Sequence, residues 1–237
     1  MKLIGLSIVL VIMACVSGLC RAMNNNNTAM LNGAKNAFVA CSNLEGVNIV
    51  DSGKVVCIRG KIDPTMFVGL LKLKDGIEQN PYVIISGMGG YADSSIYIVN
   101  MLDPYDPVPV IGDTCASACG QILMLMGRHR VLLHCADVVM HGGPTSVQAV
   151  LAQHYSDELT QRAVASISQF KDFYQDRHIS MDMVTKPPED IQKQINAGKI
   201  VFWPWSINKL RSFGVRGIVS ENDPDEAVPS DYAQSCL

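Results

Sequence analysis

With 237 residues, the chain can form one medium-sized domain with a sizeable core, or two small domains. Apolar residues make up 48% of the chain and charged residues only 17%, a composition that excludes intrinsic disorder. The formal net charge of −3, with no long basic run, gives no electrostatic basis for binding nucleic acid.

Residues 1–22 have the composition of an export signal. Lys2 is followed by an uncharged apolar run at 3–14, which is too short to span a bilayer comfortably. No other stretch of the sequence is long and apolar enough to cross a membrane. We therefore expect an exported protein, located in the bacterial periplasm or held at the membrane by one lipid.

Two ways of processing this signal remain open. The sequence Ile-Met-Ala-Cys at 12–15 resembles a bacterial lipobox, in which Cys15 would be lipidated and would become the new N-terminus. Ordinary cleavage near Gly18 or Ala22 is the alternative. Translation starting at Met23 would instead leave the protein in the cytoplasm, but the coherent signal upstream argues against it.

The N-terminal half of the chain alternates between short strands and helices. A polar linker is expected at 23–40, because its start is a run of asparagines. Apolar runs predict strands at 47–50, 55–58, 82–85, 108–111, 131–133 and 138–140, the first two forming a hairpin. Helical periodicity or composition predicts helices at 63–79, 94–102 and 117–126. A glycine-rich turn at 86–90 follows the third strand.

The C-terminal half is dominated by one amphipathic pattern. Apolar residues recur at intervals of mostly three to five over 147–174, as in one long helix or two joined helices with a single buried face. A helix at 203–213 and a strand at 217–219 follow, and the acidic tail at 221–237 is expected to be loose. The alternation of strands and helices predicts one α/β domain at 41–220 with a mainly parallel sheet.

Residues suited to acyl transfer follow three of these strands. Ligands bind at the carboxyl ends of parallel strands, and the glycine-rich turn, Ser117 and His141 all follow such ends. A serine nucleophile needs a base within reach and N–H donors for the oxyanion. We predict Ser117 as nucleophile, His141 as base, and the N–H groups of Gly90 and Ala118 as oxyanion donors. A helix N-cap is the alternative role for Ser117, and His134 is the rival base.

Eight cysteines is a high number for a cytosolic chain but normal for an exported one. Two lie in the signal region, and the others are Cys41, Cys57, Cys115, Cys119, Cys135 and Cys236. Six cysteines can pair in about 15 ways, and the sequence does not choose among them. A bridge between Cys115 and Cys119, which flank Ser117, would stiffen the proposed site. No metal site is expected, because the Cys-x3-Cys spacing occurs once and no His-x3-His spacing accompanies it.

The order of these elements resembles the ClpP/crotonase superfamily, and most closely the ClpP-like serine peptidases. Ser-Gly-Met-Gly-Gly at 86–90 resembles their oxyanion segment, which usually reads Ser-Pro-Gly-Gly; here Met88 is extra and the proline is missing. Ala-Ser-Ala-Cys-Gly at 116–120 resembles their nucleophile segment, and Met-His-Gly-Gly-Pro at 140–144 their histidine segment. Cys-Ala-Ser-Ala-Cys is similar to what exported bacterial relatives carry. The resemblance runs from about Val55 to Ile218.

The resemblance implies a spiral of repeated strand-strand-helix units, with a long helix in the C-terminal half. It places an aspartate of the catalytic triad after that helix, and Asp190 is our choice, with Asp182 and Asn196 as further options. It also implies a peptide or protein substrate and no cofactor. Family members assemble as rings or trimers with the long helix between subunits, so a homo-oligomer is expected.

The leading hypothesis is an exported ClpP-like serine hydrolase, most simply a peptidase. The rival is a catalytically inactive member of the same fold that acts as an envelope binding or assembly module. The rival gains if the Ser117 hydroxyl and the His141 ring lie more than about 5 Å apart. A third hypothesis makes Cys115 and Cys119 a redox pair.

Overall fold

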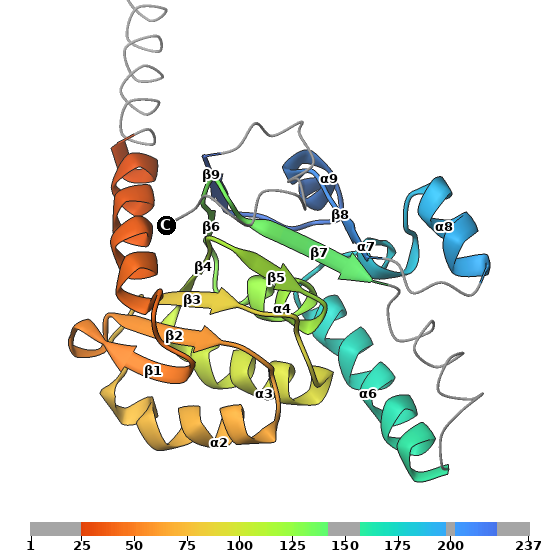
Figure 1. The fold of residues 1–237 in the computed structure, drawn as a ribbon, viewed down its shortest axis with the longest axis horizontal. Helices are drawn as coiled ribbons and strands as arrows, with labels where there is room; N and C mark the ends of the chain where they lie inside the picture. The colour runs from red at the N-terminus through yellow and green to blue at the C-terminus, as the bar shows by residue number, and fades with distance from the viewer. Residues whose placement is uncertain (1–24, 142–156, 198–201, 222–237) are drawn as a thin grey trace, which may run out of the picture.

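Two sheets form the framework of the computed structural model, which describes residues 25–141, 157–197 and 202–221 (Figure 1). The larger sheet has six strands in the order β1-β2-β3-β4-β6-β9. They are β1 Gly46–Val50, β2 Val55–Arg59, β3 Tyr82–Ser86, β4 Val108–Ile111, β6 Arg130–Leu132 and β9 Ile218–Ser220. The smaller sheet has the order β5-β7-β8, with β5 Thr114–Ala116, β7 Asp137–His141 and β8 Phe202–Pro204. Only the β1–β2 and β7–β8 pairs are antiparallel, so the prediction of an α/β fold with a mainly parallel sheet is confirmed.

Helices cover both faces of the larger sheet, and the strands are apolar on both sides as a result. The α-helices α2 Pro64–Leu73, α3 Ala92–Leu102, α4 Ala118–Gln121, α7 Asp182–Thr185, α8 Glu189–Asn196 and α9 Ile207–Ser212 are described with both ends, and α6 is described over Asp157–Asp176. One-turn 3-10 helices lie at η1 Asp51–Gly53, η2 Lys74–Gly76, η3 Asp103–Tyr105 and η4 Leu123–Leu125. Val56 and Ile58 of β2 belong to the core under α2 and α3, whereas Val55 and Cys57 belong to a second core on the other face.

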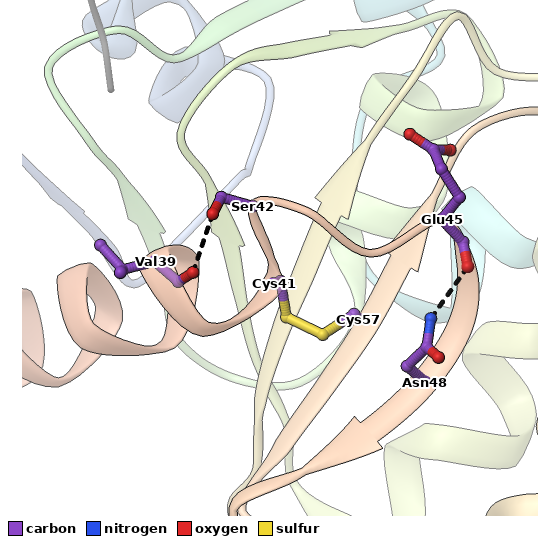
Figure 2. Close-up of a disulfide and its surroundings, with 6 residues drawn as sticks. All are labelled: Val39, Cys41, Ser42, Glu45, Asn48 and Cys57. Carbon is purple, nitrogen blue, oxygen red and sulfur yellow. Dashed lines mark hydrogen bonds between the residues drawn. A yellow bond between two sulfur atoms is a disulfide. The ribbon is translucent and has the colours of Figure 1, made fainter.

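Residues 25–41 form a helix over the second core, where the sequence analysis expects a linker up to residue 40. Ala34, Ala37, Phe38 and Cys41 are all buried there. Their spacing is that of one helical face, and this apolar stripe outweighs the polar asparagine run before it. A disulfide joins Cys41 to Cys57 in β2 and fastens the helix end to the sheet (Figure 2).

The expected helix at 117–126 is much shorter than predicted. Only Ala118–Gln121 is α-helical, and the chain then passes through Ile122, at φ −127° and ψ −61°, into the 3-10 turn η4. Residues 118–126 are all buried, as expected for so apolar a segment. Where the helix is interrupted, a backbone carbonyl needs a partner from elsewhere. The Met124 carbonyl accepts a hydrogen bond from the Arg130 guanidinium at 3.1 Å.

The predicted helix at 203–213 is in fact a strand followed by a helix. Pro204 lies in β8, an edge strand of the smaller sheet, where the missing proline N–H is tolerated. Trp203 and Trp205 are buried on either side of it. Ser206 then caps α9 by accepting a hydrogen bond from the Lys209 N–H at 3.2 Å.

Several expectations fall on segments that the structure does not describe. The signal at 1–22 with Cys15, the start of the long amphipathic stretch at 147–156, and the tail from 222 onward all lie outside the described residues. The rest of that stretch is helical, as α6. Within 25–141, 157–197 and 202–221, the helices are all too short or too polar to cross a membrane.

Candidate active site

Ser117 occupies a sharp turn between β5 and α4. Its backbone has φ 57° and ψ −130°, a conformation that a residue with a side chain rarely adopts. Such strain costs roughly 1–3 kcal/mol and is concentrated at functional sites. The turn is fixed on both sides, because the Ser117 N–H donates to the Val139 carbonyl at 3.0 Å and the Gln121 N–H donates to the Ser117 carbonyl at 2.7 Å.

The Ser117 hydroxyl contacts the His141 ring instead of capping α4. Its Oγ lies 2.5 Å from His141 Nε2, and the hydroxyl makes no capping hydrogen bond to the helix. The two residues meet because β5 and β7 are parallel neighbours, with Ala116 opposite Val139, so that their carboxyl ends lie together. The rival base His134 lies in the turn after β6, not at a strand end.

Two contacts hold the strand end that carries His141. Gln121, which is buried, donates from Nε2 to the His141 carbonyl at 2.9 Å. The buried Tyr174 hydroxyl of α6 donates to the Gln121 carbonyl at 2.9 Å, and burial raises the pKa of Tyr174 well above its usual value. Sequence reasoning missed both residues. A lone glutamine inside a buried apolar run was the available signal, because such a group needs hydrogen-bond partners.

Phe202 also lies near His141, and sequence reasoning missed it as well. It lies opposite His141 in the antiparallel β7–β8 pair, and the two ring centroids are 5.5 Å apart in an edge-on arrangement. Its side chain is nevertheless 42% exposed. It therefore forms an apolar surface beside the Ser117–His141 pair.

The glycine-rich turn lies directly against the serine turn. Ile62 forms a parallel bridge with Gly90, accepting a hydrogen bond from the Tyr91 N–H and donating to the Gly89 carbonyl. In such a bridge the N–H of Gly90 itself points away from Ile62. Among the described residues, the N–H groups of Gly90 and Ala118 have no hydrogen-bond acceptor. Their role as oxyanion donors remains a prediction.

The glycines of this turn are required by close packing. A Cβ on Gly89, which has φ +84°, would lie 2.6 Å from Ser117 Cβ and 2.8 Å from the Ala118 nitrogen. A Cβ on Gly90 would lie 2.0 Å from the Ile62 carbonyl oxygen. Met88, the residue that departs from the usual Ser-Pro-Gly-Gly pattern, is 66% exposed and lies outside this packing.

Disulfides account for every cysteine in the described part of the chain. Cys115 is bonded to Cys119 across Ser117, Cys41 is bonded to Cys57, and Cys135 is also oxidised. Disulfides of this kind persist in oxidising compartments. Oxidised sulfurs are not thiolate ligands, and the described residues bring no three His, Cys, Asp or Glu side chains together as a metal-ligand cluster.

The candidates for the triad acid lie on α7 and α8. Asp190 is in the first turn of α8 and its side chain is exposed. Asp182 forms an ion pair with Lys186 at 2.9 Å, and Asn196 accepts a hydrogen bond from Gln192 at 2.8 Å. Both alternatives thus have partners on their own helices. The role of Asp190 remains a prediction.

A cavity of about 550 Å³ lies away from this site. Its lining includes Asp106 and Arg128, which precede β4 and β6, so it opens at the amino ends of the strands. Asp106 pairs with Arg128, and Asp103 pairs with Arg177. These pairs lie near the amino ends of β4 and β6, whereas Ser117 follows the carboxyl end of β5 in the smaller sheet.

Comparison with known proteins shows a structural likeness but no matching family model. No protein-family model matches the chain, and no curated protein matches it. Among solved structures, a ClpP1 mutant from Listeria monocytogenes is similar, with a TM-score of 0.41 and 17% sequence identity over 71% of this chain and 92% of that one.

Proposed function

We propose that this chain is an exported ClpP-like serine hydrolase that cleaves peptide bonds. The observation that carries the proposal is the 2.5 Å contact between Ser117 Oγ and His141 Nε2 at a strained strand-to-helix turn. A turn of this kind exposes a nucleophile and supplies N–H groups beside it. An inactive binding module would have no need to maintain either the strain or the contact, and the distance is well below the limit of about 5 Å at which that alternative would gain.

The reaction would proceed by acyl transfer. Ser117 Oγ attacks the substrate carbonyl carbon while His141 Nε2 takes the hydroxyl proton. The N–H groups of Gly90 and Ala118 stabilise the oxyanion. The C–N bond then breaks, and His141 returns the proton to the leaving amine. Water then attacks the acyl-enzyme while His141 takes its proton; the bond from the acyl carbon to Ser117 Oγ breaks, and His141 returns the proton to Oγ as the acid leaves.

The remaining assignments rest on the resemblance of the three motifs to those of ClpP-like peptidases. Asp190 is proposed to orient the His141 ring, and the two sheets with their helices to form the spiral of strand-strand-helix units. The peptide substrate and the homo-oligomer have the same basis. The oxidised cysteines support a periplasmic protein or a lipoprotein anchored through Cys15.

A fluorophosphonate probe tests the catalytic claim directly. The wild-type protein should be labelled covalently, and Ser117→Ala and His141→Ala should lose labelling almost completely. Ser212→Ala is the matched control, because this exposed serine hydroxyl donates to the Lys209 carbonyl within α9. An unlabelled wild type, or equal labelling of Ser117→Ala, would contradict the proposal. Cleavage of a denatured protein substrate then distinguishes a peptidase from an esterase.

A further inference from the structure

The Cys115–Cys119 disulfide closes around the strained serine. Cys115 is in the middle of β5 and Cys119 is the second residue of α4, and their Cα atoms are 5.1 Å apart. Four extended residues would span about 13 Å. The bridge therefore prevents residues 115–119 from becoming extended, so Ser117 cannot relax as part of a continuous strand.

The elements on either side of Ser117 are short. β5 has three residues and α4 has four, and a single helical turn makes few hydrogen bonds for the backbone that it orders. The chain leaves α-helical geometry at Ile122, immediately after α4. A covalent restraint across the turn supplies what a longer helix would otherwise provide.

Both cysteines of this bridge are buried, so a substrate has no access to them. Cys115 is completely buried and Cys119 is 1% exposed. Their effect on catalysis therefore acts through the position of Ser117, not through contact with the substrate. The Cys41–Cys57 bridge is equally buried but joins the N-terminal helix to β2, so it provides a matched comparison (Figure 2).

We propose that Cys115 and Cys119 are positioning residues, and that Ser117 reaches its reactive geometry only when they are bonded. This inference rests on the proposed function. The bond forms by exchange with an oxidant of the disulfide class. The two thiols lose two protons and two electrons, and the oxidant's disulfide becomes two thiols. A chain that still has reduced cysteines would thus carry the full set of catalytic residues and remain inactive until export.

One peptide can report both the bridge and the labelled serine. Trypsin cuts after Lys74 and Arg128 with no Lys or Arg between them, so Cys115, Ser117 and Cys119 share one peptide. Wild-type protein is partly reduced with dithiothreitol, exposed to the fluorophosphonate probe, alkylated and analysed by mass spectrometry. We expect the probe adduct on bridged peptides, and about 10²-fold less of it on peptides with alkylated cysteines. Equal adduct on both forms would overturn the inference.

Variants separate positioning from general stability. Cys115→Ala/Cys119→Ala should lower the rate constant of covalent labelling by about 10²-fold while the apparent affinity for the probe stays within about twofold. Cys41→Ala/Cys57→Ala should retain wild-type labelling at a temperature where it is folded. A Cys115→Ala/Cys119→Ala protein that folds and labels at the wild-type rate would contradict the inference alone. A wild type without any adduct would contradict the proposed function itself.

Discussion

Gly89 lies so close to Ala118 that a Cβ on the glycine would be 2.8 Å from the alanine nitrogen. That nitrogen is one of the two proposed oxyanion donors. Gly89→Ala should therefore push the turn and the helix start apart and misalign the Ala118 N–H. Loss of one oxyanion donor costs about 10²–10³ in rate. We expect a fall of this size in the rate of fluorophosphonate labelling, measured under conditions where the variant is folded.

Gly46→Ala is the control for backbone strain. Gly46 also has a positive φ, of +72°, but a Cβ there would meet no atom within 4 Å. Both variants should therefore lose stability, about 1 kcal/mol for placing alanine at positive φ, while only Gly89→Ala loses labelling. Full labelling of folded Gly89→Ala would show that the glycine turn does not hold the oxyanion donor.

Gln121 should matter both to the reaction and to stability. Gln121→Met keeps the side-chain volume close to constant but removes the donor to the His141 carbonyl. Tyr174→Phe removes only the neighbouring bond, from the tyrosine hydroxyl to the Gln121 carbonyl. Each change should lower the free energy of unfolding by about 1–3 kcal/mol, because a buried group loses its partner. Denaturant unfolding of both variants checks this.

The two variants should differ in reactivity. With Gln121→Met, the end of β7 is free to shift, and labelling of Ser117 should slow by about tenfold or more. Tyr174→Phe should label at close to the wild-type rate. If both variants slow equally, the network holds the core together and does not position His141 in particular.

The sequence points to Ser117 and His141 because each follows a predicted strand and has a side chain suited to acyl transfer. It does not reveal why they meet. That depends on β5, a strand of three residues with too short a pattern to be recognised, and on its parallel pairing with β7. That the Ser117 hydroxyl contacts His141 and does not cap α4 likewise depends on where the side chain points, which no local pattern encodes.

Other errors of sequence interpretation have equally local causes. The helix predicted at 203–213 begins with Trp203 and Trp205, whose alternate burial around Pro204 is a strand pattern too short to outweigh the helical one after it. The asparagine run at the start of residues 25–41 favours a linker, although the buried face of this segment has helical spacing. Pairing of the cysteines needed three-dimensional proximity, since six cysteines allow about 15 arrangements.

Asp113 should make stability depend on acidic pH. Burial raises the pKa of the Asp113 carboxyl, and the hydrogen bond to Ser86 and the charge of Arg59 oppose the shift only in part. A carboxyl whose pKa is raised on folding stabilises the protein below its unfolded pKa, and this contribution is lost as pH rises through the folded pKa. Wild type should therefore lose stability relative to Asp113→Asn as pH rises above about 3.9, the unfolded value.

Asp63 provides a control of opposite sign. The side chain of Thr65 and the N–H of Met66 hydrogen-bond to the Asp63 carboxylate and lower its pKa. Wild type should gain stability relative to Asp63→Asn as pH rises through that lowered pKa. Denaturant unfolding of the three proteins between about pH 3 and pH 7 measures both trends. Parallel pH curves for wild type and Asp113→Asn would contradict the shift at Asp113.

Asp190→Asn tests the proposed third member of the triad. A triad aspartate fixes the tautomer and orientation of its histidine, and replacing it by asparagine lowers the rate by about 10⁴ without disturbing the structure. Asp182→Asn is the control, because this nearby carboxylate is engaged by Lys186. If Asp190 orients His141, only Asp190→Asn should lose labelling, and its circular dichroism and unfolding curve should match wild type. Unchanged labelling of Asp190→Asn would show that another group orients the histidine.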